Sequence, residues 1–403
     1  MTDVRPNTIK FQNCLLGGAI GGALGRRAEL ALKTNAEKSV QSRTAEPLEK
    51  DGPWLAVTSD SQLALGVAIG LIGAQTRYNS RGIANPIAMI NSSLLSYLEF
   101  QTRRPKVDDL DGPLFFTDVI IYDFAEKMLW REFDRFVKRG EDRGLNHSGS
   151  SKFDLKMSQE SARIKGFDSR YDSCPTAMVG PIGLFVVKDR VLEMAAETIC
   201  LSYHLDLAVL SAGAYALTVS ELAHQESGSV SLLKAVTLAV KSLKKSNDRK
   251  TASEFMFLPK EPLRISKHPK AGLFYGALKT AIKLAKDPKI ALDLAIARLT
   301  YEDKTLDVLV KSLYLALTAE SYQEGVSRAV SLQGDAGAYG TLTGQLLGLI
   351  YGLEGLPNNW LEHLEAREFI ANVAEDLDKA PDEDPDQDIE SDERIILHYD
   401  YYL

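Results

Sequence analysis

The sequence predicts an all-α protein with one main domain. Apolar residues recur at helical spacing along most of the 403 residues, strand patterns are weak except at residues 395–403, and no long Pro-, Gly- or Ser-rich linker interrupts the chain. We therefore expect a single helical domain over residues 1–380 and an acidic tail over residues 381–403. The acidic run at 382–393 is typical of a solvated spacer. The pattern at 395–403 fits either an edge strand or a free end.

The first predicted helix, residues 14–30, has many glycines and alanines between large apolar residues. Glycine disfavours a helix in water, so this composition is tolerated where other helices must approach the backbone closely. We expect this helix to be central and buried. Residues 31–53 are polar and irregular, which indicates a surface loop or an extended crossing.

The second predicted helix covers residues 60–72, with Ser59 or Asp60 as its N-cap. Helical patterns follow at residues 85–97 and 114–137. Residues 139–170 are polar and have few large apolar side chains, which indicates a long loop.

The second half of the chain continues the helical pattern. Predicted helices lie at residues 181–185, 191–207, 208–224, 230–245, 271–284, 290–299, 305–318, 323–332, 339–353 and 360–377. The helix at 339–353 is as rich in small residues as the first one. The last helix carries Trp360 and Phe369 on its apolar face.

Charge and composition exclude some classes of function. The formal net charge of -8 argues against a nucleic-acid-binding protein, whose surface is usually basic. The lysine-rich stretch at 234–270 is interpreted as a polar helix face plus a loop, with attraction of an acidic partner as the alternative. The three cysteines lie far apart, so we expect buried, reduced thiols.

The N-terminus does not have the pattern of a signal peptide. The most apolar stretches, residues 14–24 and 63–74, are too short to cross a bilayer. The sequence therefore predicts a soluble, cytoplasmic protein with no membrane partner.

Three segments, residues 21–29, 58–65 and 334–344, combine oxygen-bearing side chains with Gly- and Ala-rich helices. Thr58-Ser59-Asp60-Ser61 offers hydroxyls and one carboxylate, and Asp335 offers another carboxylate. Helix N-termini favour anions, and a bound cation needs several oxygen ligands. Gathered together, these segments would form a site for a cation or for a phosphate.

These motifs resemble, in the same order, those of the ADP-ribosylglycohydrolase family, of the arginine-directed and dinitrogenase-reductase-activating type. Residues 11–25 and Glu29 resemble the family's opening helix and its acidic position, and Thr58-Ser59-Asp60-Ser61 resembles its Thr-Asp-Asp-Thr segment. The later matches are the central substrate loop at 172–185, the small-residue helix at 202–216 and the closing segments at 334–357 and 360–377.

The resemblance implies an orthogonal helical bundle. It also implies a cleft that, in working members, holds two magnesium ions and removes ADP-ribose from a modified side chain. It implies catalytic roles for Glu29 and Asp60, and a metal site made by Thr58, Asp60 and Asp335. The substrate-binding residues that it implies are Ser59, Ser61, Ser173, Thr176 and Tyr339.

The departures from the family pattern fall on the metal ligands. Among the metal ligands, Ser59 and Gly337 stand where the resemblance expects aspartates, and Ala338 stands where it expects a hydroxyl. Gly22 stands at the position of the family's buried aspartate in the first helix. Further changes are Ser61 for Thr, Val179 for Arg and Pro175 for Gly. Two of the four metal-binding carboxylates are missing, and two dications about 4 Å apart repel strongly. We expect one weakly bound magnesium ion at most, or none.

Each acidic site residue also has a purely structural interpretation. Glu29 could be a solvated residue at a helix end, while Asp60 and Asp335 could be helix N-caps. Ser59 and Ser61 could be caps as well.

Three functions fit these observations. The one we favour is a non-catalytic or weakly catalytic binding protein that protects a bacterium against an ADP-ribosyltransferase toxin, by binding the toxin or an ADP-ribosylated protein. The second is an active hydrolase that removes ADP-ribose from modified arginine or another acceptor with one metal ion or none. The third is a regulatory protein that binds ADP-ribose or a nucleotide.

Overall fold

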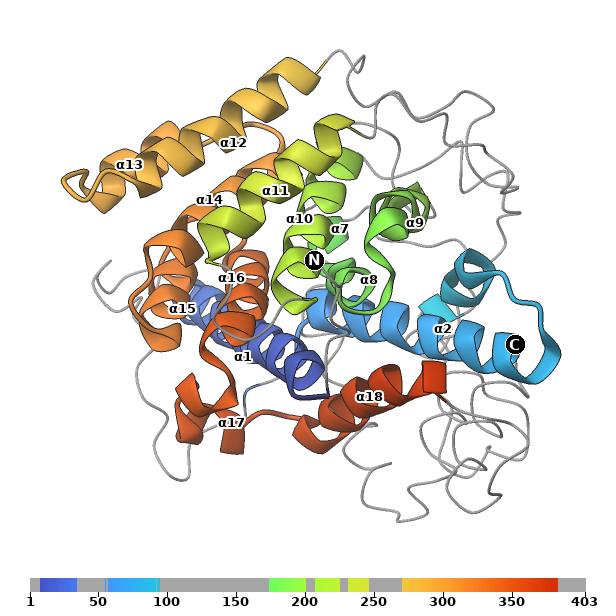
Figure 1. The fold of residues 1–403 in the computed structure, drawn as a ribbon. Coiled ribbons are helices and arrows are strands. Elements are labelled where there is room, and N and C mark those ends of the chain that lie inside the picture. The colour runs from blue at the N-terminus through green and yellow to red at the C-terminus, as the bar shows by residue number, and fades with distance from the viewer. Residues whose placement is uncertain are drawn as a thin grey trace.

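The computed structural model describes residues 8–34, 55, 57–91, 93–94, 174–200, 207–224, 231–245 and 270–382. These residues form a helical bundle, and their only β-pairing is an isolated bridge between Leu55 and Leu364 (Figure 1). The predicted all-α class is therefore confirmed. The predicted helix at 114–137, the loop at 139–170 and the strand pattern at 395–403 lie outside the described residues, and the boundary between domain and tail stays a prediction.

The centre of the bundle is the contact between α1 (Thr8–Thr34) and α16 (Ala336–Tyr351), which run beside each other in Figure 1. Gly17 and Gly21 of α1 face Gly344 and Gly340 of α16. A Cβ atom added to Gly21 would lie 2.0 Å from the carbonyl oxygen of Gly340, and one added to Gly17 would lie 2.5 Å from that of Gly344. The two backbones thus touch directly, which confirms that the small-residue helices are central.

Helix α2 (Ser59–Arg81) is longer than the predicted helix at 60–72. Its N-cap is Thr58 rather than Ser59 or Asp60, so that prediction was wrong by one or two residues. Asp60 lies in the first turn of the helix. The helix ends at Gly82, whose φ of 69° is the left-handed conformation that favours glycine, and whose N–H bonds to Tyr78 O. A short helical segment follows at residues 86–91, within the predicted range of 85–97.

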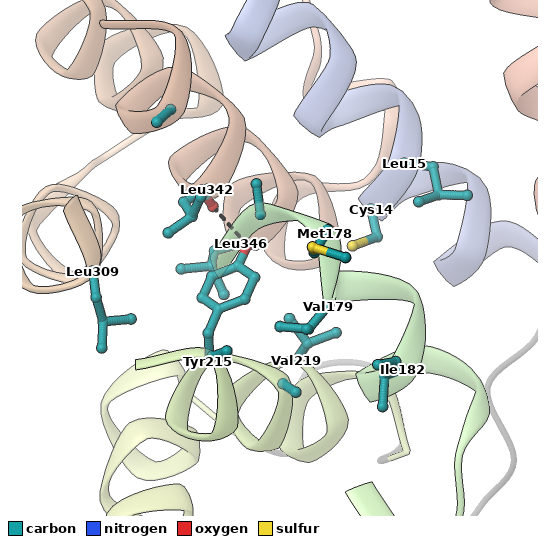
Figure 2. Packing of buried hydrophobic residues seen from close by; sticks show 14 of the residues in the cluster. Cys14, Leu15, Met178, Val179, Ile182, Tyr215, Val219, Leu309, Leu342 and Leu346 are labelled. Atoms are coloured by element: carbon teal, nitrogen blue, oxygen red, sulfur yellow. Dashed lines mark hydrogen bonds between the residues drawn. The ribbon is translucent and has the colours of Figure 1, made fainter. Parts of the chain in front are cut away.

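The described residues between 174 and 245 form the helices α7 (Cys174–Met178), α8 (Gly180–Phe185), α9 (Lys188–Cys200), α10 (Leu207–Ala223) and α11 (Leu232–Lys245). Helix α10 is buried along almost its whole length and packs against α8, α9 and α11. Its Tyr215 hydroxyl donates to the backbone oxygen of Leu342 in α16 (Figure 2). The same hydroxyl also lies within hydrogen-bond distance of Gln345 Oε1. This side chain ties the middle of the chain to the central helix pair.

Helices α12 (Ala271–Ala285), α13 (Leu292–Arg298), α14 (Lys304–Thr318) and α15 (Tyr322–Val330) follow at the positions that the sequence predicts. Asp303 caps α14 by accepting from Leu306 N, and Ser321 caps α15 by accepting from Glu324 N. Helices α14 and α15 both pack on α16. Helix α12 lies at the edge of the bundle in Figure 1, and its Gly272 and Gly276 face open space.

The predicted single helix at 360–377 was wrong. The structure has two helices there, α17 (Asn358–Glu362) and α18 (Arg367–Lys379), flanked by the short 3-10 turns η5 (Leu353–Gly355) and η6 (Ala380–Asp382). The chain leaves the helical path because residues 363–365 pair with Leu55 across the β-bridge. Ala366 then takes the left-handed conformation, with a φ of 54°, before α18 begins.

Cys14 is the cysteine whose side chain the structure describes. Cys14 is buried with a free thiol, and burial raises its pKa above its usual range. It lies near Met178 and Val179 in the core shown in Figure 2. The side chains of Cys174 and Cys200 lie outside the described part. Within that part, no helix combines the length and the apolar character that crossing a membrane requires.

Glu197 of α9 is a buried carboxylate that lies away from the predicted site residues in the sequence. Only 3% of the residue is exposed, and its Oε1 atom finds no hydrogen-bond donor among the described residues. Burial, together with the charge of Glu193, raises its pKa from 4.5 to about 7, although Arg190 acts in the opposite direction. The folded protein therefore holds a proton on Glu197 at a pH where the unfolded chain does not.

We expect Glu197→Gln to stabilise the protein at high pH and not at low pH. Because the folded pKa is raised, the favourable contribution of the protonated side chain is present below pH 4.5 and is lost as the pH rises through about 7. The difference in unfolding free energy between variant and wild type should grow by about 1–2 kcal/mol between pH 5 and pH 8. Urea unfolding at several pH values measures it, and a difference that does not change with pH would contradict the expectation.

Candidate functional site

Three carboxylates from three separate parts of the chain meet around Gly337, in the first turn of α16. A Cβ atom added to Gly337 would lie 3.6 Å from Asp335 Oδ1, 3.7 Å from Asp60 Oδ2 and 3.9 Å from Glu29 Oε1. We call Glu29, Asp60 and Asp335 the carboxylate cluster. The structure thus brings together both residues predicted to be catalytic and two of the three predicted metal ligands.

The first turn of α16 holds two members of the carboxylate cluster. Gly337 N donates to Glu29 Oε1 over 3.1 Å, and Ala338 N donates to Asp335 Oδ1 over 3.0 Å. Asp335 is therefore the N-cap of α16, as the structural interpretation predicts. Because unpaired N–H groups give a helix N-terminus a partial positive charge, both carboxylates are stabilised there.

Glu29 is not a solvated residue at a helix end. It lies within α1, and its Oε2 atom pairs with Arg26 Nη1 at 3.4 Å. Burial and the nearby charge of Asp335 raise the pKa of Glu29, while the Gly337 N–H and Arg26 lower it. The net shift of the Glu29 pKa is upward. The Gly337 N–H and Arg26 therefore do not fully offset the effects of burial and of the Asp335 charge.

The carboxylate cluster does not fit a pair of magnesium ions. Mg²⁺ requires near-octahedral oxygen ligands at about 2.0–2.1 Å. Among the described residues, no three His, Cys, Asp or Glu side chains are close enough together to hold a metal ion. At the centre of the cluster stands Gly337, which has no side chain to offer and which occupies the position where the family resemblance implies an aspartate.

Hydroxyl groups fill the second position where the resemblance implies an aspartate, Gly22. A Cβ atom added to Gly22 would lie 2.4 Å from Thr341 Oγ1, 2.7 Å from Thr58 Oγ1 and 3.5 Å from Ser61 Oγ. Thr341 donates to Gly337 O, whereas the buried hydroxyls of Thr58 and Ser61 have no hydrogen-bond partner among the described residues. This side of the site is therefore neutral, and a side chain at position 22 would require the hydroxyls of Thr341 and Thr58 to move.

Ser61 is not a helix cap. It lies inside α2 and lines a small cavity together with Ala19, Ala64 and Gln345. Ser59 is the first residue of α2. Ser173 lies outside the described residues. Their predicted roles in substrate binding stay predictions.

The two remaining predicted substrate-binding residues are both buried. Thr176 lies in α7, and its hydroxyl has no partner among the described residues. Tyr339 lies in α16, and its hydroxyl donates to Asp307 Oδ2, beside Lys311 Nζ. Burial and the charge of Asp307 raise the pKa of Tyr339, so its hydroxyl stays protonated and serves as a donor inside the protein.

One residue close to the site has no counterpart in the predictions. Glu365, between α17 and α18, accepts a hydrogen bond from Val57 N over 3.1 Å, just before Thr58 and Asp60. In the sequence, Glu365 falls within a helical pattern, and nothing local marks it as a partner of residues some 300 positions away.

Comparisons with known proteins agree with this architecture. A family model described as ADP-ribosylglycohydrolase matches residues 5–387. The chain belongs to the ADP-ribosylglycohydrolase family. The family resemblance seen in the sequence is thereby confirmed over nearly the whole chain.

Relatives of known name match a shorter stretch. The chain is similar to "ADP-ribosylarginine hydrolase Tri1" of Serratia proteamaculans (strain 568), with 32% identity over 80 residues, and to the protein of the same name in Pseudomonas putida (strain GB-1), with 30% identity over 80 residues. Each match covers 20% of this chain and 22% of the relative. The matched stretch is thus about a fifth of each of these ADP-ribosylglycohydrolase relatives.

A solved structure supports the fold over most of the chain. The structure described as "ADP-ribosylglycohydrolase-related protein complex" superposes with a TM-score of 0.52, at 17% sequence identity, and covers 93% of this chain and 98% of its own. At this identity the likeness shows the fold alone.

Proposed function

We propose that this protein is a binding member of the ADP-ribosylglycohydrolase family that hydrolyses ADP-ribose links slowly or not at all. The observation that carries the proposal is the glycine at position 337, where three carboxylates meet but no fourth completes the cluster. Such a protein would recognise an ADP-ribosylated protein, or the transferase that modifies it, through the ADP-ribose-binding region of the fold.

Electrostatics support the loss of the magnesium pair. Two divalent cations 4 Å apart repel by about 17 kcal/mol at an effective dielectric constant of 20, so a metal pair needs carboxylates between and beside the ions. Gly22 faces only hydroxyls, and Gly337 adds no ligand. Glu29, Asp60 and Asp335 are not close enough together to enclose a metal ion as they stand, so we propose one weakly held cation at most, or none.

The relatives point to the chemical class of partner. Two of them are named ADP-ribosylarginine hydrolases, so we propose modified arginine as the mark that this protein recognises. Protection of a cell against an ADP-ribosylating toxin is the biological role that this binding would serve.

An active hydrolase is the second candidate, because Glu29, Asp60 and Asp335 still converge on one point. A carboxylate with a raised pKa, such as Glu29, is better suited to proton transfer than an ordinary glutamate. This candidate requires turnover that depends on the carboxylate cluster.

The deciding experiment measures binding and release together. Purified protein is incubated with an arginine-ADP-ribosylated protein in magnesium, and both the complex and the free ADP-ribose are quantified. We expect a stable complex and a release rate below about a thousandth of that of an active family member. Metal analysis of the same sample reports the bound magnesium.

The control is the triple variant Glu29→Gln, Asp60→Asn, Asp335→Asn. Ordinary enzymatic release by the wild type that disappears in this variant would establish the hydrolase instead. If the wild type neither binds the ADP-ribosylated protein nor releases ADP-ribose from it, both candidates are ruled out.

A further inference from the structure

The segment that leads into α2 is fixed by the corner between α17 and α18. Leu55 N donates to His363 O over 2.8 Å, and Glu365 N donates to Leu55 O over 2.9 Å, which forms the isolated parallel bridge of Leu55 with Leu364. Two residues further on, the chain reaches Val57, and Thr58 and Asp60 follow. The position of these site residues therefore depends on a corner that is distant in the sequence.

Glu365 makes the last contact before the site. Its Oε2 atom accepts from Val57 N at 3.1 Å, and Gln62 Nε2 donates to Val57 O at 3.0 Å. Val57 is fully buried and Glu365 is 4% exposed. Both polar groups of the Val57 backbone are thus held by side chains, one from the α17–α18 corner and one from α2 itself.

Burying the Glu365 carboxylate at this contact costs free energy, because a buried charge loses its hydration. Two features favour it here. The N-terminus of α2 lies directly after Val57 and stabilises a nearby negative charge. A hydrogen bond from an N–H group to a charged acceptor is also stronger than one to a neutral acceptor.

The backbone at the corner is held in an uncommon conformation. Ala366, directly after Glu365, has a φ of 54°, and it is the only residue other than glycine with positive φ in the described part of the chain. Such a conformation persists only where the surrounding structure enforces it. The β-bridge and the Glu365 contact supply that enforcement.

We propose that Glu365 is a positioning residue of the site: its contact with Val57 N sets the place of Thr58 and Asp60 relative to Glu29 and Asp335. The part of this proposal that concerns ADP-ribose affinity rests on the proposed function. The other part, that Glu365 keeps the backbone of residues 57–62 in a fixed conformation, can be tested without any ligand.

The test compares Glu365→Ala and Glu365→Gln in the full-length protein. Glu221→Ala is the matched control, since Glu221 of α10 is equally buried and pairs with Lys188 at 2.5 Å, away from residues 57–62. Hydrogen exchange is measured on peptides that cover residues 55–65, and ADP-ribose affinity is measured by calorimetry at a temperature where every variant is folded.

We expect amide exchange at residues 57–62 to become about tenfold faster in Glu365→Ala and ADP-ribose affinity to fall about tenfold. Glu365→Gln keeps an acceptor oxygen, so it should restore most of both quantities. Glu221→Ala should lower thermal stability and leave both quantities unchanged.

The outcomes separate the two ideas. Unchanged exchange at residues 57–62 in Glu365→Ala, or an equal increase in Glu221→Ala, would overturn the positioning role. A wild type that gives no binding heat with ADP-ribose would count against the proposed function, and the exchange data would still decide the role of Glu365.

Discussion

Gly337→Asp is expected to make the stability of the protein depend on magnesium. A Cβ atom at this position meets no atom closer than 3.6 Å, and the nearest oxygens are those of Asp335, Asp60 and Glu29. The added carboxylate therefore fits without displacing the backbone and completes a four-carboxylate set. Four acidic groups with oxygen ligands facing one another are a binding site for a hard cation.

The expected result has two parts. In a chelator the variant should unfold at a lower temperature than the wild type, because a fourth negative charge adds repulsion. With magnesium at about 100 times its dissociation constant, binding should add about 2.7 kcal/mol, which for a chain of this size corresponds to about 3 °C. Thermal unfolding with and without magnesium measures both parts.

Two controls isolate the effect. Gly337→Asn has nearly the same size and no charge, so its unfolding temperature should not respond to magnesium. Gly22→Asp restores the other acidic position, but its Cβ would lie 2.4 Å from Thr341 Oγ1 and 2.7 Å from Thr58 Oγ1. It should destabilise the protein equally in magnesium and in chelator. A Gly337→Asp protein that unfolds at the same temperature in both solutions would refute the expectation.

Gly21→Ala is expected to destabilise the protein by about 3 kcal/mol or more, which is the upper range for an overpacked core. The added methyl group would lie 2.0 Å from Gly340 O and 2.7 Å from Gly340 C. Both are backbone atoms, so they cannot turn away as a side chain would. The two central helices would have to separate, and the contact that brings Glu29 to Gly337 N would lengthen.

The matched control is Gly276→Ala in α12, where an added Cβ atom meets nothing within 4 Å. This variant should stabilise the protein by about 0.5–1 kcal/mol, since alanine favours a helix more than glycine does. Urea unfolding of both variants gives the two free energies. Equal effects of the two substitutions would show that helix propensity, and not close approach of the backbones, explains the glycines.

The sequence predicts the central helix pair well because the cause is local and periodic. Gly17 and Gly21 are spaced by four residues, as are Gly340 and Gly344, so each set lies on one face of its helix. A helix with this composition is stable only where a neighbour needs the space. The N-cap role of Asp335 can also be predicted from the sequence because its cause is local. The capping side chain and the N–H group that donates to it are only three residues apart.

Prediction from the sequence fails where a local structure is caused by contacts with a distant part of the chain. The break between α17 and α18 follows from pairing with Leu55, and the helical pattern of residues 360–377 contains no sign of it. Tyr339 is a similar case. Nothing local in the sequence marks the hydrogen bond from its hydroxyl to Asp307, 32 positions away, while the role in substrate binding that the resemblance implies stays a prediction.

The unequal surroundings of Gly22 and Gly337 bear on how this protein can evolve. An aspartate at 337 meets no close atom at its Cβ position, since the nearest one lies 3.6 Å away. At Gly22 the Cβ atom of an aspartate would lie 2.4 Å from Thr341 Oγ1 and 2.7 Å from Thr58 Oγ1, so both side chains would first have to turn. A descendant of this protein can therefore gain a carboxylate at 337 without any other substitution, whereas a carboxylate at 22 also requires the surrounding hydroxyl side chains to move.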